Sequence, residues 1–214
     1  MGGHRDIETR DEETVKSYWD AVNDLQKRGK QGKFARIFDI CVEKNAELHP
    51  DDKRRKYKGR VVNGGDRVWD EYGEIALFEE INSCPSTMEA AKAAFFYGML
   101  DGHTIQSADA TQAYTQAEID NTTAEHWVEL PEHAWPAHWW NADGTPKYKR
   151  PVCKLRLALY GHPCSGGYWE KHCERHLRAQ GFQDVPNWRS CFYHPGLDLF
   201  LVVYVDDFLL AGPK

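Results

Sequence analysis

The chain of 214 residues is 41% hydrophobic, so it can bury a sizeable core as one domain or two small lobes. Its net charge of −6 argues against a uniformly basic surface, although residues 53–60 hold six cations and residues 147–156 form a second basic stretch. No apolar run approaches the roughly 18 residues of a membrane span, and the N-terminus lacks the apolar stretch of a signal peptide. We therefore expect an intracellular protein, cytoplasmic or nuclear, without a membrane partner. Its six cysteines are dispersed with no C-x-x-C pair, which predicts free thiols.

The first half of the chain mixes predicted helices and strands. Apolar residues at helical spacing predict an amphipathic helix over residues 12–28, and a strand at Val61-Val62 follows the first basic segment. A capping box at residues 86–89 opens a helix that runs to about Leu100. A short strand and a turn then carry Asp109.

The second half begins with a predicted loop over residues 134–148, which contain two prolines and an Asp-Gly pair. A helix follows over residues 168–180 and ends before Gly181. Because the elements lack the regular alternation of a parallel sheet, we expect an α+β fold with helices on one face of an antiparallel sheet.

Near the C-terminus, Tyr204-Val205-Asp206-Asp207 lies between two strongly apolar runs, which predict buried strands joined by a tight hairpin. Two adjacent carboxylates repel each other, and burying either one unpaired would cost roughly several kcal/mol. A divalent cation removes that cost, so a metal site is one interpretation. An ordinary turn that carries two acids is the other.

Two further segments strengthen the first interpretation. Residues 109–114 read Asp-Ala-Thr-Gln-Ala-Tyr, and residues 154–161 read Lys-Leu-x-x-x-Leu-Tyr-Gly, ahead of a Pro/Gly-rich bend and Trp169. In this order the segments resemble the reverse transcriptase of copia-type (Pseudoviridae-like) retrotransposons, where xDVxxAF, KLxxxLYGLKQxxxxW and YVDD follow one another. The resemblance covers roughly residues 57–213. YVDD alone is weakly specific, whereas the three segments together are a strong signal.

The resemblance implies a polymerase palm and part of the fingers over residues 51–214, truncated after the YVDD hairpin and without a thumb. An N-terminal helical extension would occupy residues 1–50. The implied activity is that of an RNA-directed DNA polymerase, as a fragment of a retrotransposon Pol polyprotein. Its partners would be an RNA or DNA template with a primer, dNTPs, and the integrase and RNase H domains of the parent element. Its location would be a cytoplasmic virus-like particle or the nucleus.

The resemblance also implies a catalytic site. Asp109, Asp206 and Asp207 would hold two Mg²⁺ ions, or Mn²⁺ in their place, because hard cations require oxygen ligands. Tyr114 would leave no room for a 2′-hydroxyl and so select deoxynucleotides. Lys58 and Arg60 lie in a segment similar to the family's YKARLV strand and would contact the triphosphate or the template backbone. The alternative for these two cations is a solvated charge run.

The middle motif departs from the family pattern, because LYGLKQ is replaced here by Leu-Tyr-Gly-His-Pro-Cys. Cys164 stands where relatives have a glutamine near the nucleotide, and a thiol is a weak donor, which puts catalytic efficiency in doubt. Gly161 either allows a close backbone approach to a nucleotide or forms a simple turn. A catalytically silent, nucleic-acid-binding remnant is therefore the main alternative function.

Three other interpretations stay open. His172 and His176 are one helical turn apart, with Cys164 upstream, and could bind Zn²⁺, although ordinary surface or core histidines are favoured. Trp135, Trp139 and Trp140 would stack on bases or, as we favour, anchor a loop. A metal-dependent nuclease would use the same three acids.

Overall fold

A computed structural model describes residues 9–78, 83 and 85–214 of the chain. The contacts divide it into two compact units, which are taken separately below. Unit 1 comprises the described residues up to Phe78 together with Glu118–Ser165, and unit 2 those of Glu79–Ala117 together with Gly166–Lys214. The first eight residues of the expected N-terminal extension, and Cys84, lie outside the described residues.

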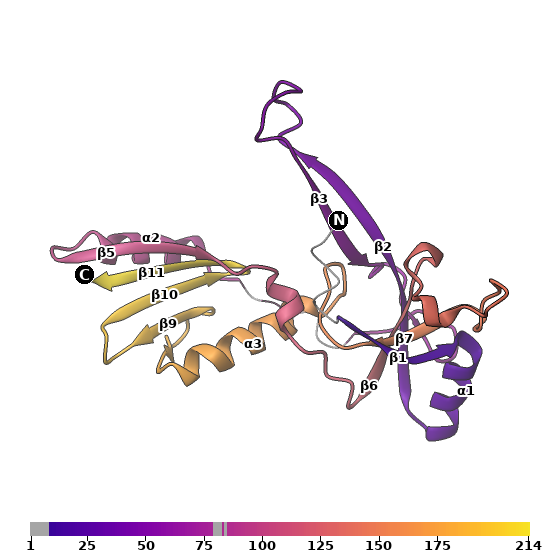
Figure 1. Cartoon of the computed structure of the whole chain (residues 1–214). Coiled ribbons are helices and arrows are strands. Elements are labelled where there is room, and N and C mark those ends of the chain that lie inside the picture. The colour runs from indigo at the N-terminus through magenta and orange to yellow at the C-terminus, as the bar shows by residue number, and fades with distance from the viewer. Residues whose placement is uncertain (1–8, 79–82, 84) are drawn as a thin grey trace. The chain divides into compact units, whose positions relative to one another are not determined.

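The expected α+β class is confirmed (Figure 1). Over the described residues the chain forms three α-helices, a six-stranded sheet in unit 1 and a five-stranded sheet in unit 2. None of the helices in this described part combines the length and the apolarity that crossing a bilayer requires. The described cysteines are all free thiols, as expected.

The sheet of unit 1 has the strand order β1-β7-β6-β2-β3, with β4 paired to β2 beside this path. Its strands are β1 (Arg10–Ser17), β2 (Gln31–Lys44), β3 (Lys56–Asn63), β4 (Trp69–Asp70), β6 (Ala124–Glu129) and β7 (Pro151–Leu155). This sheet is mixed rather than antiparallel, because β2 and β6 run parallel. Residues up to 50, expected as a helical extension, contain β1 and β2 and belong to unit 1.

Helix α1 (Tyr18–Arg28) begins six residues later than the predicted start at residue 12, because residues 10–17 form β1 and pair with β7. Tyr18, Val22 and Leu25 lie at helical spacing and pack on Phe34 and Trp127 of the sheet. This cluster is the core of unit 1 next to α1.

The loop predicted over residues 134–148 is present, with the short 3₁₀ turns η2 (Glu132–Ala134) and η3 (Ala137–Trp139) and an isolated β-bridge between Trp140 and Pro146. Trp139 is fully buried, and the Trp135 ring N–H donates to the carbonyl of Leu130 at 2.9 Å. These contacts support the loop-anchor interpretation of the tryptophans over base stacking.

The sheet of unit 2 is antiparallel, with the order β5-β11-β10-β9-β8. Its strands are β5 (His103–Asp109), β8 (Gln183–Asp184), β9 (Cys191–His194), β10 (Leu199–Tyr204) and β11 (Asp207–Pro213). The predicted apolar hairpin is therefore formed by β10 and β11. The strand that carries Asp109 is β5, which lies next to β11.

Two helices complete unit 2, α2 (Met88–Gly98) and α3 (Ser165–Ala179). The cap of α2 is Thr87, whose side chain accepts from the Ala90 N–H, one residue later than the first residue of the expected capping box.

The helices of unit 2 lie against opposite faces of its sheet, so the expectation of helices on one face is wrong here (Figure 1). Val202 packs with Ala90 and Ala94 of α2, whereas its neighbour Val203 shares a pocket with Trp169 of α3. Successive residues of a strand point to opposite faces, so both faces of β10 are covered.

Candidate functional site

The strand register of unit 2 brings the three predicted acids to one end of the sheet. Asp109, the last residue of β5, lies directly opposite Asp207, the first residue of β11. The backbone N–H of Ala110 donates to the carbonyl of Asp206 at 2.7 Å, which extends the pairing by one step. Asp109 and Asp207, here called the acid pair, are thus neighbours although they are 98 positions apart in the sequence.

The acid pair projects from one face of the sheet. Opposed residues in a non-hydrogen-bonded position have Cα atoms about 4.5 Å apart and side chains on the same face. Asp109 and Asp207 occupy such a non-hydrogen-bonded position, because the adjacent hydrogen bond joins Ala110 to Asp206, the residues that flank the pair. Both carboxylates are exposed, and Tyr204, opposite Asp207 on β10, is 55% exposed.

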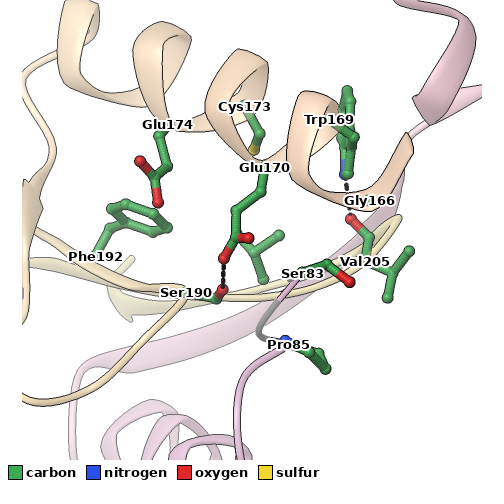
Figure 2. A pocket seen from close by; sticks show the side chains of 11 residues that line it. Ser83, Pro85, Gly166, Trp169, Glu170, Cys173, Glu174, Ser190, Phe192 and Val205 are labelled. Atoms are coloured by element: carbon green, nitrogen blue, oxygen red, sulfur yellow. Dashed lines mark hydrogen bonds between the residues drawn. The ribbon is translucent and has the colours of Figure 1, made fainter. Parts of the chain in front are cut away.

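Asp206 lies in the two-residue turn between β10 and β11, after Val205. Val205 has a φ of 56°, a left-handed conformation that is rare for a β-branched residue and costs on the order of 1–3 kcal/mol. The ring N–H of Trp169 in α3 donates to the Val205 carbonyl at 2.6 Å and helps to hold the turn (Figure 2). The structure therefore fixes the backbone of the residue that precedes Asp206.

The donor chemistry at this end of the sheet suits a hard cation such as Mg²⁺, because the acid pair and Asp206 offer carboxylate oxygens. Across the described residues, however, no three His, Cys, Asp or Glu side chains are arranged as a group that could hold a metal ion. Asp109 and Asp207 share a face, and Asp206 is half-buried in the adjoining turn. A site with three carboxylates would thus need the Asp206 side chain to rotate towards the acid pair.

Tyr114 follows Asp109 on the same segment of unit 2, in the 3₁₀ turn η1 (Ala113–Gln116). Gln112 precedes this turn with a φ of 55°, and its carbonyl accepts both the N–H and the hydroxyl of Thr115. A 3₁₀ turn therefore follows β5 closely, and it holds the half-buried Tyr114 near the acid pair in the sequence.

The other predicted contacts belong to unit 1. Lys58 and Arg60 lie on β3, in the long hairpin with β2, where they face Val42 and Ile40. Both cations are exposed, and the guanidinium of Arg60 lies 5.5 Å from the centre of the Tyr160 ring. Lys58 thus remains a candidate for a phosphate contact, whereas Arg60 also packs on an aromatic face.

Gly161 lies in the loop of residues 157–164, here called the Gly161 loop, and it makes packing contacts within unit 1. Its φ is 84°, and a Cβ there would lie 2.2 Å from the carbonyl oxygen of Asn63. A Cβ on Gly65 would in turn lie 1.9 Å from the carbonyl oxygen of Gly161. The close approach that the sequence suggested is therefore made with the protein's own backbone at the end of β3, and not with open space for a nucleotide.

The residues after Gly161 form a buried imidazole pair that the sequence did not predict. The Nδ1 of His162 accepts from the backbone N–H of Cys164 at 3.1 Å, so the proton of this ring is on Nε2. That N–H donates to the Nδ1 of His126 on β6 at 3.0 Å. Cys164, the residue in the position of the family glutamine, is half-buried and holds this pair through its backbone.

Burial keeps both imidazoles neutral. It lowers the pKa of His126 to about 4, with Lys33 acting in the same direction and Asp120 against it. Burial likewise lowers the pKa of His162 to about 3, helped by His126 and Lys33. The pair is therefore a neutral hydrogen-bonded link between the Gly161 loop and β6 at physiological pH.

The contacts around His172 and His176 do not favour a zinc site. The two rings lie 4.3 Å apart between centroids, but the Nδ1 of His176 is hydrogen-bonded to the His172 carbonyl within α3. Cys173, between them in sequence, lines a pocket with residues of the sheet instead. The interpretation of ordinary helix histidines is the better supported one.

Comparisons with protein-family models and with curated proteins find no match to this chain.

Proposed function

We propose that the chain is the reverse transcriptase domain of a copia-type retrotransposon, an RNA-directed DNA polymerase. Unit 2 would be the palm, and the β2–β3 hairpin of unit 1 would be part of the fingers. The observation that supports this most is the register that sets Asp109 opposite Asp207, beside the turn that carries Asp206. Asp109 and Asp207 come from two distant segments and lie opposite each other at the end of one sheet, with Asp206 in the adjoining turn.

The proposed reaction is templated transfer of a dNMP to a primer 3′-hydroxyl with release of pyrophosphate. Two Mg²⁺ ions held by Asp109, Asp206 and Asp207 would neutralise charge on the attacking and departing oxygens. The contribution of the protein is positional. A strand end and a short hairpin turn, fixed by the Trp169 bond to Val205, keep the acids at one place.

Tyr114 would provide sugar selection in this proposal. Its turn follows β5 directly, so the ring is tied to the same strand as Asp109. If the ring packs beneath the incoming sugar, replacing it by a small side chain opens room for a 2′-hydroxyl. We expect Tyr114→Ala to raise ribonucleotide incorporation relative to deoxynucleotide incorporation by about tenfold or more, the equivalent of roughly 1.4 kcal/mol.

Primer extension on poly-rA/oligo-dT with Mg²⁺ or Mn²⁺ tests the proposal. Wild-type chain should incorporate dTMP, and Asp206→Asn should lower the rate by at least about a hundredfold, because a metal ligand contributes several kcal/mol of charge stabilisation. Asp101→Asn, an exposed acid in the loop before β5, is the matched control and should leave the rate unchanged. Strand cleavage that needs no dNTP would identify a nuclease instead.

The silent remnant is the second candidate, and Cys164 is the observation that favours it. Its thiol replaces an amide that would donate a hydrogen bond, and its backbone is committed to His162. A remnant predicts tight binding of primer-template without incorporation in the wild-type chain. Recovery of incorporation in Cys164→Gln would assign the defect to this one position and retain the polymerase ancestry.

A further inference from the structure

Strand β5 forms one margin of the sheet of unit 2, and its outer side pairs with no other described strand (Figure 1). The backbone hydrogen bond from Ala110 to Asp206 shows that the even-numbered residues of β5 exchange hydrogen bonds with β11. The odd-numbered residues therefore turn their backbone groups to the open margin. Across the described residues, the N–H groups of Ile105 and Ser107 have no partner.

This margin lacks the features that usually protect an edge strand, which are Lys or Pro residues, a bulge or a very short length. The other outermost strands have them. Strand β3 carries Lys56, Lys58 and Arg60, β1 contains a register shift, and β8 has two residues. Strand β5 instead has seven residues in unbroken register, without Lys, Arg or Pro. It is therefore the margin most open to pairing with another chain.

Helix α2 places apolar side chains over the same margin. A Cβ on Gly98 would lie 2.9 Å from the Cβ of Ile105, so this position of the helix faces β5. Tyr97 faces the β9–β10 side, because its hydroxyl donates to the carbonyl of Asp198 at 3.1 Å. With about 100° of rotation per residue, Phe95 lies on the opposite side of Gly98 from Tyr97. Its ring therefore overhangs the outer side of β5.

The apolar area over this margin is large enough for a specific interface. Phe95 is 51% exposed, and Met99, on the same flank of α2, is 84% exposed. Burying a whole aromatic side chain removes about 150–250 Å² of surface. These two side chains and the outer side of β5 would together bury roughly 1,000 Å² over two copies of the chain, which is about the area that a biological interface needs.

The sequence of β5 is complementary to itself when a second copy runs antiparallel with Gln106 opposite Gln106. This register overlaps the whole strand, because residue 106 is its midpoint. It pairs Ile105 with Ser107, which then exchange both N–H···O bonds, and it sets His103 opposite Asp109. The amide of Gln106 carries both a donor and an acceptor, so it can bond to its own copy.

We propose that β5 is a homodimer interface, where two copies of this chain pair their β5 strands antiparallel around a two-fold axis at Gln106. The two sheets of unit 2 become one continuous sheet. Phe95 of each copy packs against the other copy on the face that α2 covers, and the two Gln106 amides meet on the opposite face. This interface goes beyond the proposed function and needs no nucleic acid.

Sedimentation equilibrium tests the dimer. The mass of the wild-type chain should rise from 24.7 kDa towards twice that value as the concentration increases. Gln106→Lys sets two like charges opposite each other and should weaken dimerisation by at least about tenfold. Gln183→Lys is the matched control, an exposed glutamine on β8 at the other margin of the same sheet, and should leave the dimerisation constant unchanged. Circular dichroism of both variants checks that they are folded.

Charge reversal tests the register. Gln106→Glu should also weaken its own dimer, but mixed with Gln106→Lys it should form a heterodimer at least about tenfold tighter than either homodimer, because position 106 meets itself. A wild-type chain that stays monomeric would leave this margin to a strand of another protein and overturn the proposal. A dimer that Gln106→Lys does not weaken, or a mixture that gains nothing, would overturn it equally. These outcomes do not depend on polymerase activity.

Discussion

The acid pair of unit 2 and the Gly161 loop of unit 1 were both predicted as site residues from the same resemblance, yet the structure treats them differently. Asp109 and Asp207 are exposed and, over the described residues, have no hydrogen bond or ion pair to their carboxylates. Gly161 is pressed against the backbone of Asn63, and His162 and Cys164 are joined to one another and to His126. The carboxylates of the acid pair are accessible to a ligand, whereas the residues of the Gly161 loop make contacts that stabilise the fold.

The difference between the acid pair and the Gly161 loop follows from where each of them lies in the fold. A strand that terminates at a hairpin turn leaves its last side chains beyond the covering helices, so acids there cost little desolvation. The Gly161 loop instead passes close to the end of β3, where backbone polar groups need partners. The carbonyl of Tyr160, for example, accepts the Asn63 N–H at 2.7 Å. A motif match therefore carries more functional weight at a strand end than in a packed loop.

The largest expected effect concerns Gly161. Gly161→Ala would bring a Cβ to 2.2 Å from the Asn63 carbonyl oxygen and would strain a left-handed backbone, so it should lower the free energy of unfolding by about 3 kcal/mol or more. Gly144, also in unit 1, has a similar φ of 81° with nothing within 4 Å of its added Cβ. Gly144→Ala should cost only about 1 kcal/mol, for the backbone alone.

Urea unfolding of the two variants, followed by circular dichroism, measures this difference. Equal losses of stability would mean that Gly161 is needed only for its backbone angle, and the packing role of the loop would be refuted. The comparison with the acid pair would then lose its basis.

A smaller effect is expected from pH. The pKa values of His126 and His162 are lower in the folded chain than the ordinary value near 6.5, so the unfolded chain binds protons first as the pH falls. Their contribution to stability is fully present above about pH 6.5 and is lost as the pH falls towards about 4. Between pH 7 and pH 5 the loss should be on the order of 2 kcal/mol for each histidine.

The variant His162→Leu removes one titrating group of the pair and should flatten this pH dependence, at the cost of the acceptor for the Cys164 N–H. His138→Gln changes an exposed histidine in the same unit and should leave the slope as in the wild type. A loss of stability below pH 6.5 that is as steep in His162→Leu as in the wild type would assign the effect to other groups.

How much of the fold the sequence could predict depends on how far apart in the chain the residues that determine each feature lie. The β10–β11 hairpin and helix α3 follow from local apolar patterns and turn residues, and both were found. The parallel pairing of β2 with β6 and the His126–His162 bond join segments far apart in the chain, and no spacing indicates them. The local pattern predicts helix from residue 12, but residues 12–17 belong to β1 because its pairing with β7 overrides that pattern.

The candidate site shows the same limit. The identity of its acids could be read from the motifs, but the register that sets Asp109 opposite Asp207 is a property of the sheet. The left-handed backbone of Val205 in the turn could not be predicted, because a β-branched residue is not expected in that conformation. The packing role of Gly161 could not be predicted either, because it depends on the contact with Asn63 in the folded chain.

The smallest expected effect tests the acid pair itself. Like charges directly opposite each other on neighbouring strands destabilise a sheet by about 0.2–1 kcal/mol, so Asp207→Asn should raise the free energy of unfolding by about 0.5 kcal/mol in metal-free buffer. Asp101→Asn, away from the pair, should have no such effect. If the pair also binds Mg²⁺, millimolar Mg²⁺ should raise the melting temperature of the wild type more than that of Asp207→Asn, because a ligand that binds only the folded chain stabilises it. If Asp207→Asn is more stable than the wild type but responds to Mg²⁺ equally, the two carboxylates face each other and hold no metal. That result would support the geometry of the sheet and contradict the metal chemistry proposed for it.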